Sequence, residues 1–164
     1  MSGVADDEIG EWLCDLAAPI GGWKIFHTAT FDPGGWEYDG TPRPDRSAKD
    51  PFVALDRYKR FMQERDRQKV TWVVGIEPNV DHHGINRGYH CHAIWAGTDE
   101  IWRTSSFKRW ANQYGNNKCD AVRTGGEGDV QRYVSKYCLK ENALWDVQIN
   151  DHKVWLQQQL QLAR

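Results

Sequence analysis

The chain has 164 residues, of which 40% are hydrophobic and 27% are charged, and its net charge at pH 7 is −2. That length suffices for one domain with a hydrophobic core, and the slight negative charge argues against a general nucleic-acid coat protein, which is normally basic. No apolar run approaches the length of a membrane span, and the first residues carry no signal-peptide core. We therefore expect one domain over residues 1–164 with no membrane partner.

The four cysteines are scattered along the chain and form no Cys-x-x-Cys pair. They are Cys14, Cys91, Cys119 and Cys138. This spacing is typical of reduced thiols in a cytosolic protein rather than of a disulfide framework or a thiolate zinc site.

The first half of the chain predicts a helix, a strand and a second helix. Residues 6–18 have an apolar helical period with acidic residues in the first turn, and residues 23–31 alternate and are rich in β-forming side chains. A loop rich in proline and glycine follows. The second helix is expected over about 48–67, with Ser47 or Asp50 as its N-terminal cap. Its apolar stripe is expected to contain Phe52, Leu55, Tyr58 and Met62.

The second half predicts a central hairpin followed by further alternating elements. In chain order these are strands over 70–77 and 89–96, a helix over 104–115, a strand over 117–124, a helix over 130–142 and a helical tail over about 144–164. Strands interspersed with helices, around a central antiparallel hairpin, predict an α+β fold in which helices flank the sheet.

Two histidines in "GYHCHAIW" (88–95) raise the question of a metal site. On a strand, His90 and His92 point to the same face. A hairpin centred near Gly84 puts Glu77 roughly opposite Cys91 and beside the two imidazoles. Two imidazoles and a carboxylate suit a divalent cation that also takes a substrate oxygen. The alternative is that the histidines are half of an ordinary solvent-facing strand.

Two tyrosines in "RYVSKYCLK" (132–140) repeat a helical spacing. Tyr133 and Tyr137 are four residues apart, so on a helix they share one face, and Lys136 and Lys140 each follow a tyrosine by three residues. A phenol becomes a useful nucleophile when a cation stabilises its anion, and an adjacent lysine contributes to that. The alternative is an amphipathic helix with tyrosines in the core and lysines in water.

Taken together, a metal triad on a sheet and a lysine-flanked tyrosine pair on a later helix are the parts of a phosphodiester transesterase. In such an enzyme the ion polarises a phosphate, which a tyrosine attacks. The sequence therefore favours nucleic-acid strand cleavage by tyrosine.

Three ordered motifs resemble those of the HUH-type replication initiators, the rolling-circle Rep endonucleases of small phages, plasmids and single-stranded DNA viruses. "FHTATFD" (26–32) is similar to their first motif, a strand with a Thr-x-Thr core, and "GYHCHAIW" to their His-hydrophobic-His motif. "YVSKYCLK" (133–140) resembles their third motif in the two-tyrosine form of microvirus-type initiators. The motifs span about residues 24–140.

The resemblance implies an RRM-like antiparallel sheet, an Mg²⁺ or Mn²⁺ cofactor and a role for each motif residue. The implied activity is that of a sequence-specific single-stranded DNA nickase and strand transferase, which initiates rolling-circle replication through a 5′-phosphotyrosine intermediate. The implied metal ligands are His90, His92 and Glu77, the implied main nucleophile is Tyr137 with Lys140, and the implied second nucleophile is Tyr133 with Lys136.

The resemblance also implies the partners and the setting of the protein. The partners are single-stranded origin DNA, hairpins included, and a host helicase and polymerase. The setting is the cytoplasm of a prokaryotic host, with a host nucleus as the alternative. No P-loop sequence is present, so no helicase domain is expected on this chain. Tryptophans that could stack on bases, although such residues are more often core, are Trp23, Trp36, Trp72, Trp95 and Trp110. Basic residues that could line a groove, although scattered surface charges are at least as often inert, are Arg43, Arg46, Lys59, Arg60, Arg103, Lys108 and Arg109. The sequence assigns none of these residues as a DNA contact.

Three other readings stay open at this point. Non-haem iron oxygenases and cupins also use two histidines and a carboxylate, but the cupin pattern wants a glutamate where this chain has Trp95 and Ala96. A non-enzymatic RRM-like nucleic-acid binder would leave the histidines merely exposed. Two-tyrosine HUH transposases share the same motifs.

Overall fold

The computed structural model describes residues 3–64, 69–98, 102–122 and 144–149. The elements are α1 (Gly3–Ala17), the short 3₁₀ helix η1 (Ala18–Ile20), β1 (Trp23–Ala29), β2 (Gly35–Trp36), β3 (Pro42–Arg43), α2 (Pro51–Gln63), β4 (Thr71–Val80), β5 (Asn86–Ala96), α3 (Trp102–Gln113), β6 (Asn117–Ala121) and β7 (Leu144–Gln148).

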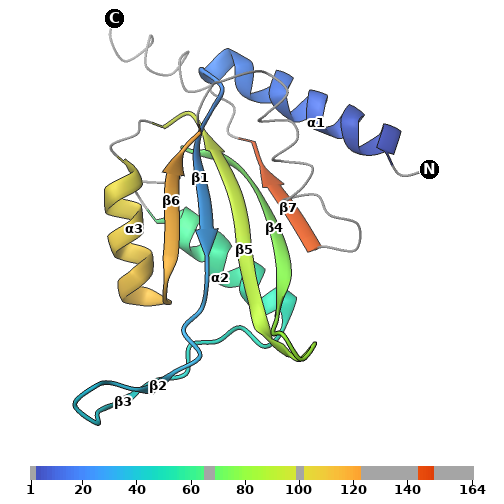
Figure 1. Ribbon diagram of the computed structural model, residues 1–164. Helices are drawn as coiled ribbons and strands as arrows, with labels where there is room; N and C mark the ends of the chain where they lie inside the picture. The colour runs from blue at the N-terminus through green and yellow to red at the C-terminus, as the bar shows by residue number, and fades with distance from the viewer. Residues whose placement is uncertain (1–2, 65–68, 99–101, 123–143, 150–164) are drawn as a thin grey trace, which may run out of the picture.

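A five-stranded sheet in the order β6-β1-β5-β4-β7 forms the centre of the fold, and each pair of neighbouring strands is antiparallel (Figure 1). The small β2–β3 ribbon projects from the end of β1. The predicted α+β class with a helix-flanked antiparallel sheet is confirmed. Within the described ranges, no helix is both long and apolar enough to cross a membrane.

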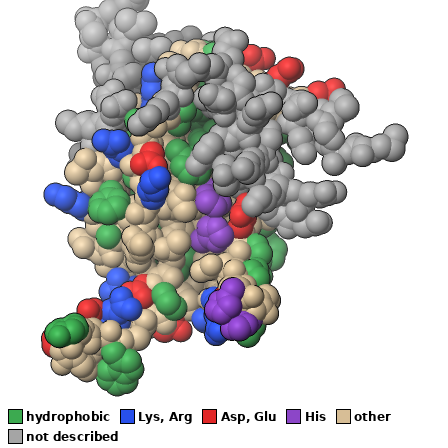
Figure 2. Space-filling view, viewed as in Figure 1, with side chains coloured by type: hydrophobic (Ala, Val, Ile, Leu, Met, Phe, Trp, Pro, Cys, Tyr) green, Lys and Arg blue, Asp and Glu red, His purple; other side chains and the backbone are tan. Residues whose placement is uncertain are grey.

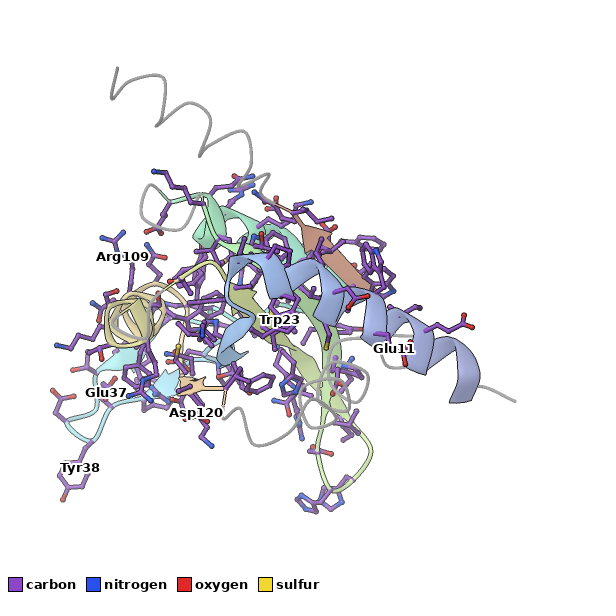
Figure 3. The ribbon with its side chains drawn as sticks, turned by 90° about the horizontal axis from the view of Figure 1, so that it is seen from above. Glu11, Trp23, Glu37, Tyr38, Arg109 and Asp120 are labelled. Atoms are coloured by element: carbon purple, nitrogen blue, oxygen red, sulfur yellow. The ribbon has the colours of Figure 1, made fainter. Side chains whose placement is uncertain are left out.

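Helices cover the two faces of the sheet, and each face has its own apolar cluster. On one face α2 and α3 pack over a cluster that includes Trp72, Trp95 and Trp110. On the other face α1 crosses one end of the sheet and packs over a smaller cluster around Trp23 and Ile94, as the view from above shows (Figure 3). Both faces of the inner strands are therefore buried at that end, where Val73 of β4 lies in the cluster under α1 and Trp72 and Val74 lie in the cluster under α2.

The N-terminus of α2 is fixed by a side-chain cap. Asp50 lies in extended backbone, and its carboxylate accepts hydrogen bonds from the backbone N–H groups of Phe52 (2.8 Å) and Val53 (3.2 Å). Pro51 occupies the first helical turn, where its missing N–H costs nothing. Of the two predicted caps, Asp50 is the one that the structure uses.

The apolar stripe predicted for α2 is wrong at one position. The Phe52 side chain is 67% exposed, because it lies about a third of a turn around the helix from Tyr58, at the centre of the buried face. The predicted Tyr58 and Met62 are buried and Leu55 is partly buried. The buried side chains of α2 are Ala54, Tyr58, Phe61 and Met62.

The predicted helical tail over 144–164 is wrong for its first residues, which form strand β7. This strand pairs antiparallel with β4, from Ile76 opposite Leu144 to Trp72 opposite Gln148. The sequence "LWDVQ" alternates at a period of two, and pairing satisfies the edge of β4. On the α2 side, Asp146 accepts from the Lys59 ammonium at 2.7 Å. Residues 150–164 lie outside the described part of the chain.

A chain of buried hydrogen bonds links five elements: β6, α3, β1, α2 and β5. The Asn117 amide donates to the Phe107 carbonyl (3.0 Å), which turns its oxygen toward His27 Nε2 (3.2 Å). His27 Nε2 therefore donates and Nδ1 accepts, from the Tyr58 hydroxyl at 3.2 Å, while the Trp95 indole N–H donates to the Tyr58 oxygen at 2.8 Å. In the neutral ring this pattern of donors and acceptors corresponds to the tautomer with the proton on Nε2.

We expect Tyr58→Phe to lower the free energy of unfolding by about 1–3 kcal/mol, because the Trp95 N–H and His27 Nδ1 both lose a buried partner. Urea unfolding followed by fluorescence measures this. Tyr114→Phe is the matched control, since in the described residues the Tyr114 hydroxyl has no hydrogen-bond partner and the change should stay within about 0.5 kcal/mol. Equal stability of the two variants would contradict a structural role for the chain of hydrogen bonds.

Candidate metal centre

The register of the central hairpin brings Glu77 directly opposite His90. The sequence had placed Glu77 roughly opposite Cys91, one residue away. The turn is centred one residue earlier than predicted, since Val80 pairs with Asn86. An extra residue on β5, between Asn86 and Tyr89, then shifts the ladder by one position and places Glu77 opposite His90. Because directly opposite residues share a face, this register puts the carboxylate on the same face as the imidazoles.

Glu77, His90 and His92 converge on one point. Their ligand atoms lie within 4.8 Å of one another. His90 Nε2 is 3.0 Å from His92 Nε2, and each of these nitrogens is 3.9 Å from Glu77 Oε2. The three side chains are 18%, 12% and 11% exposed in the order His90, His92, Glu77. In the described part of the chain this is the group of donors that could hold a metal ion.

The donor positions fit a shared cation. Two imidazole nitrogens that bind one ion at roughly 2.0–2.1 Å are about 2.9–3.4 Å apart at ordinary ligand angles, and the observed separation is 3.0 Å. The Glu77 oxygen lies 3.9 Å from each nitrogen, so a small side-chain rotation of about 0.5 Å completes the set. Two nitrogens and a carboxylate oxygen leave coordination positions for water or substrate.

Cys91, between the two histidines in sequence, belongs to the other face. Its side chain is buried in the cluster under α2, and burial raises the pKa of its thiol well above the ordinary range. A buried thiol without a nearby cation stays protonated and inert. Cys14, Cys91 and Cys119 are all free thiols, as the sequence predicted.

His92 is also held by residues of β1 that the sequence analysis did not single out. Thr28 lies directly opposite His92 in the β1–β5 ladder, and its Oγ1 is 3.2 Å from His92 Nδ1. The Phe26 ring stacks on the imidazole at 6.0 Å between centroids, with 23° between the planes. The alternation in "FHTATFD" puts Phe26 and Thr28 on one face, but only knowledge of the β1–β5 pairing identifies their neighbour.

The tip of the β4–β5 hairpin carries a second histidine pair that does not belong to the cluster. Figure 2 shows histidines gathered in two places on this face, one over the sheet beside an acidic side chain and one at the hairpin tip. Asp81 organises the tip by accepting from the N–H groups of His83 and Ile85, and the Ile85 hydrogen bond is the largest cause of its lowered pKa. His82 and His83 are exposed, and their rings are in contact with centroids 3.8 Å apart and planes tilted by 44°.

Most of the candidate DNA-contacting side chains are either buried or paired with another part of the fold. Of the five tryptophans, only Trp36 is exposed, at 74%, on the β2–β3 ribbon near the labelled Glu37 and Tyr38 (Figure 3). Most of the basic residues already have partners in the fold: Arg43 with Asp32 and Glu37, Arg46 with the Asn112 carbonyl, Lys59 with Asp146, Arg60 with Asp56, and Arg109 with Glu64.

The predicted tyrosine helix over 130–142, with Tyr133, Lys136, Tyr137 and Lys140, lies outside the described residues. Its place relative to the histidine cluster therefore stays a prediction.

Comparisons with known proteins identify no family for this chain. No protein-family model matches it, and no curated protein matches it. Among solved structures, the chain is similar to the N-terminal nuclease domain of the minute virus of mice non-structural protein 1, at 9% identity over 90% of this chain and 79% of that chain, with a TM-score of 0.37. That domain is described as coordinating Zn²⁺ in its active-site pocket and as recognising DNA at an origin of replication. A likeness this distant leaves the function to be argued from the residues of this chain.

We expect His92→Ala and Glu77→Gln to weaken Mn²⁺ binding by more than about 100-fold, since losing a ligand costs more than the 10–100-fold typical of an outer-shell change. Isothermal titration calorimetry of the full chain measures the affinity, and circular dichroism checks the fold. His82→Ala is the matched control because it removes an imidazole from the hairpin tip. Equal losses in all three variants, or none, would show that the cluster is not the metal site.

Proposed function

We propose that this protein is a metal-dependent endonuclease of the HUH type, which nicks single-stranded DNA at a replication origin and becomes joined to the new 5′ end through a tyrosine. The observation that carries the proposal is the convergence of Glu77, His90 and His92 on one face of the central hairpin. The ordered sequence motifs, with two Tyr-x-x-Lys units after the histidines, support the same reaction.

In this proposal the two imidazoles and the carboxylate hold Mg²⁺ or Mn²⁺. When bound, the ion would polarise the scissile phosphate and neutralise charge that develops on its oxygens. The chain's own contribution is to orient the ligands. The low exposure of all three side chains limits competition from bulk water, and the rigid ladder on which they stand fixes their spacing.

Tyr137 is the proposed nucleophile of the first step. Its phenolic oxygen forms a bond to phosphorus and gives up its proton, while the bond from phosphorus to the 3′ oxygen breaks and that oxygen takes up a proton. The product is a 5′-phosphotyrosine and a free 3′ hydroxyl. Lys140 stabilises the phenolate or the phosphate charge. Tyr133, with Lys136, is proposed to carry out the second transfer that rejoins the strand.

Two features of the structure favour this function over the alternatives. Cupins are double-sheet β structures, whereas here a single open sheet is covered by helices on both faces. A non-enzymatic nucleic-acid binder would leave His90 and His92 pointing separately into solvent, whereas their Nε2 atoms are 3.0 Å apart beside a carboxylate. Transposases of the two-tyrosine type share the same chemistry and differ in the DNA on which they act.

The proposed partners follow from the reaction. The substrate is single-stranded origin DNA, including hairpins that present a single-stranded loop. Strand separation and synthesis would come from a helicase and a polymerase of the host, and a prokaryotic cytoplasm is the proposed setting. Initiation of rolling-circle replication is the process that uses a nick, a free 3′ end and a later rejoining step in this order.

The activity is tested by incubating the protein with end-labelled single-stranded hairpin DNAs and Mg²⁺, Mn²⁺ or Zn²⁺. We expect a protein–DNA adduct that survives denaturing electrophoresis, because a covalent bond holds the 5′ phosphate. His92→Ala should lose the adduct, because two remaining ligands cannot hold the ion, whereas His82→Ala should form it normally. The proposal is wrong if no origin from a broad panel of small circular genomes is cleaved under any of these metals.

Phenylalanine variants distinguish the proposed roles of the two tyrosines. Tyr137→Phe should remove most first-step cleavage, since the ring stays but the nucleophilic oxygen is lost. Tyr133→Phe should nick and attach to DNA, yet fail to rejoin the strand. Mass spectrometry of the DNA-linked peptide identifies the attacking residue, and a joining assay tests the second step. DNA attached only to Tyr133 would reverse the two roles, and normal rejoining by Tyr133→Phe would remove Tyr133 from the mechanism.

A further inference from the structure

We propose that Thr28 is a positioning residue for the metal centre, which holds His92 in the tautomer that presents a bare Nε2 to the ion. This inference rests on the proposed metal site and adds to it a residue from a third strand. Thr28 does not touch the reacting atoms; it acts through His92.

The geometry connects Thr28 to one atom of the ligand. Thr28 and His92 are direct partners in the β1–β5 ladder, and Thr28 Oγ1 lies 3.2 Å from His92 Nδ1. The opposite ring nitrogen, Nε2, is the one that faces His90 and Glu77. The imidazole therefore spans the distance between the hydroxyl on β1 and the cluster on β4 and β5.

The chemistry of a neutral imidazole then gives the hydroxyl its role. If Nε2 donates its lone pair to a cation, the ring proton must be on Nδ1, and a mostly buried N–H requires an acceptor. Thr28 Oγ1 is at hydrogen-bonding distance for that purpose. The same tautomer is consistent with the 3.0 Å contact between the two histidines, in which His90 Nε2–H donates to the bare His92 Nε2.

Phe26 restrains the rotation of the His92 ring out of its plane. Its ring stacks on His92 with 23° between the planes, and it is itself 7% exposed within the cluster under α1. A rotation of the imidazole about its own axis would have to displace this packed ring. Thr28 thus determines which nitrogen carries the proton, while Phe26 determines the plane of the ring.

The next threonine on the same face shows that the position is specific. Thr30 follows Thr28 by two residues, and its hydroxyl donates to the Asn116 carbonyl at 2.6 Å. It ties the end of β1 to the segment before β6 and contacts no metal ligand in the described structure. The two threonines of the Thr-x-Thr sequence therefore have different partners, and Thr30, the residue directly after β1, provides a matched control.

The first experiment measures Mn²⁺ affinity in the full chain by calorimetry. Thr28→Val keeps the shape and removes the acceptor, so we expect affinity to fall by about 10–100-fold, the usual effect of losing an outer-shell partner of a histidine ligand. Thr28→Ser keeps the hydroxyl and should stay within about threefold of the original affinity. Thr30→Val should also stay within about threefold. Unchanged affinity in a folded Thr28→Val protein, or a loss in Thr28→Ser as large as in Thr28→Val, would overturn the proposal.

The second experiment needs neither metal nor activity. Nitrogen-15 NMR of the histidine rings in the metal-free chain, at a pH where they are neutral, reports which nitrogen of His92 is protonated. We expect the Nδ1–H form in the original protein and in Thr28→Ser, and a mixture in Thr28→Val. A dominant Nε2–H form in the original protein would overturn the proposal even if Thr28→Val does not fold.

The two experiments separate this inference from the proposed function. If His92→Ala abolishes metal binding but Thr28→Val does not weaken it, the metal site stands and the role of Thr28 is wrong. If the original protein binds no divalent metal, the proposed function fails, and the role of Thr28 at a metal centre fails with it. The tautomer would then describe only a structural hydrogen bond.

Discussion

The antiparallel ladder between β4 and β5 controls the position of every donor in the candidate site. Side chains on a strand alternate, so Glu77 shares a face with His90 and His92 only because it lies opposite a histidine and not opposite Cys91. A slip of β4 by one residue would bury the carboxylate among the aromatic side chains under α2, on the opposite face from the two imidazoles. The extra residue on β5 between Asn86 and Tyr89 therefore matters as much as any ligand, since it reconciles a turn built around Asp81 with the register that the site requires.

The face that carries the site is divided along the strands into an apolar half and a polar half. Under α1, Phe26, Ile94 and Val73 form a row across three strands, and the next row contains Thr28, His92 and Gly75. The imidazole of His92 thus lies at the border, with an aromatic ring on one side and the donors on the other. An apolar neighbour lowers the local dielectric, which strengthens the attraction between a cation and its ligands. Helix α1, which covers the apolar half of this face, therefore also affects the electrostatics of the neighbouring site.

The sequence predicted those parts of the fold and site that depend on neighbours close along the chain. The hairpin and the placement of His90 and His92 on one face follow from local periodicity, and the capped start of α2 follows from Asp50.

The sequence predicts a helix where strand β7 forms, because "LWDVQ" is short and becomes a strand only by pairing with β4. The stripe predicted for α2 includes Phe52, whereas the buried face is centred on Tyr58 and leaves Phe52 outside it. The contact of Thr28 with His92 could not be predicted, because the two residues are 64 positions apart and no local pattern in the sequence indicates that their strands pair. The tyrosine pair remains a prediction, since its residues lie outside the described ranges.

The three candidate ligands come from one continuous segment, residues 77–92. The threonine that supports them, Thr28, lies on β1, far from that segment in the sequence. Hairpins close in about 1–10 μs, long before pairings of high sequence separation are made. During folding the donors can therefore meet before β1 docks, and a chain at that stage would hold a cation with unrestrained imidazoles. Docking of β1 then adds Phe26 and Thr28 to His92 in a single step. In this order of assembly, the β4–β5 hairpin alone is enough to bring the ion's ligands together. Holding those ligands in one geometry requires the complete sheet, including β1.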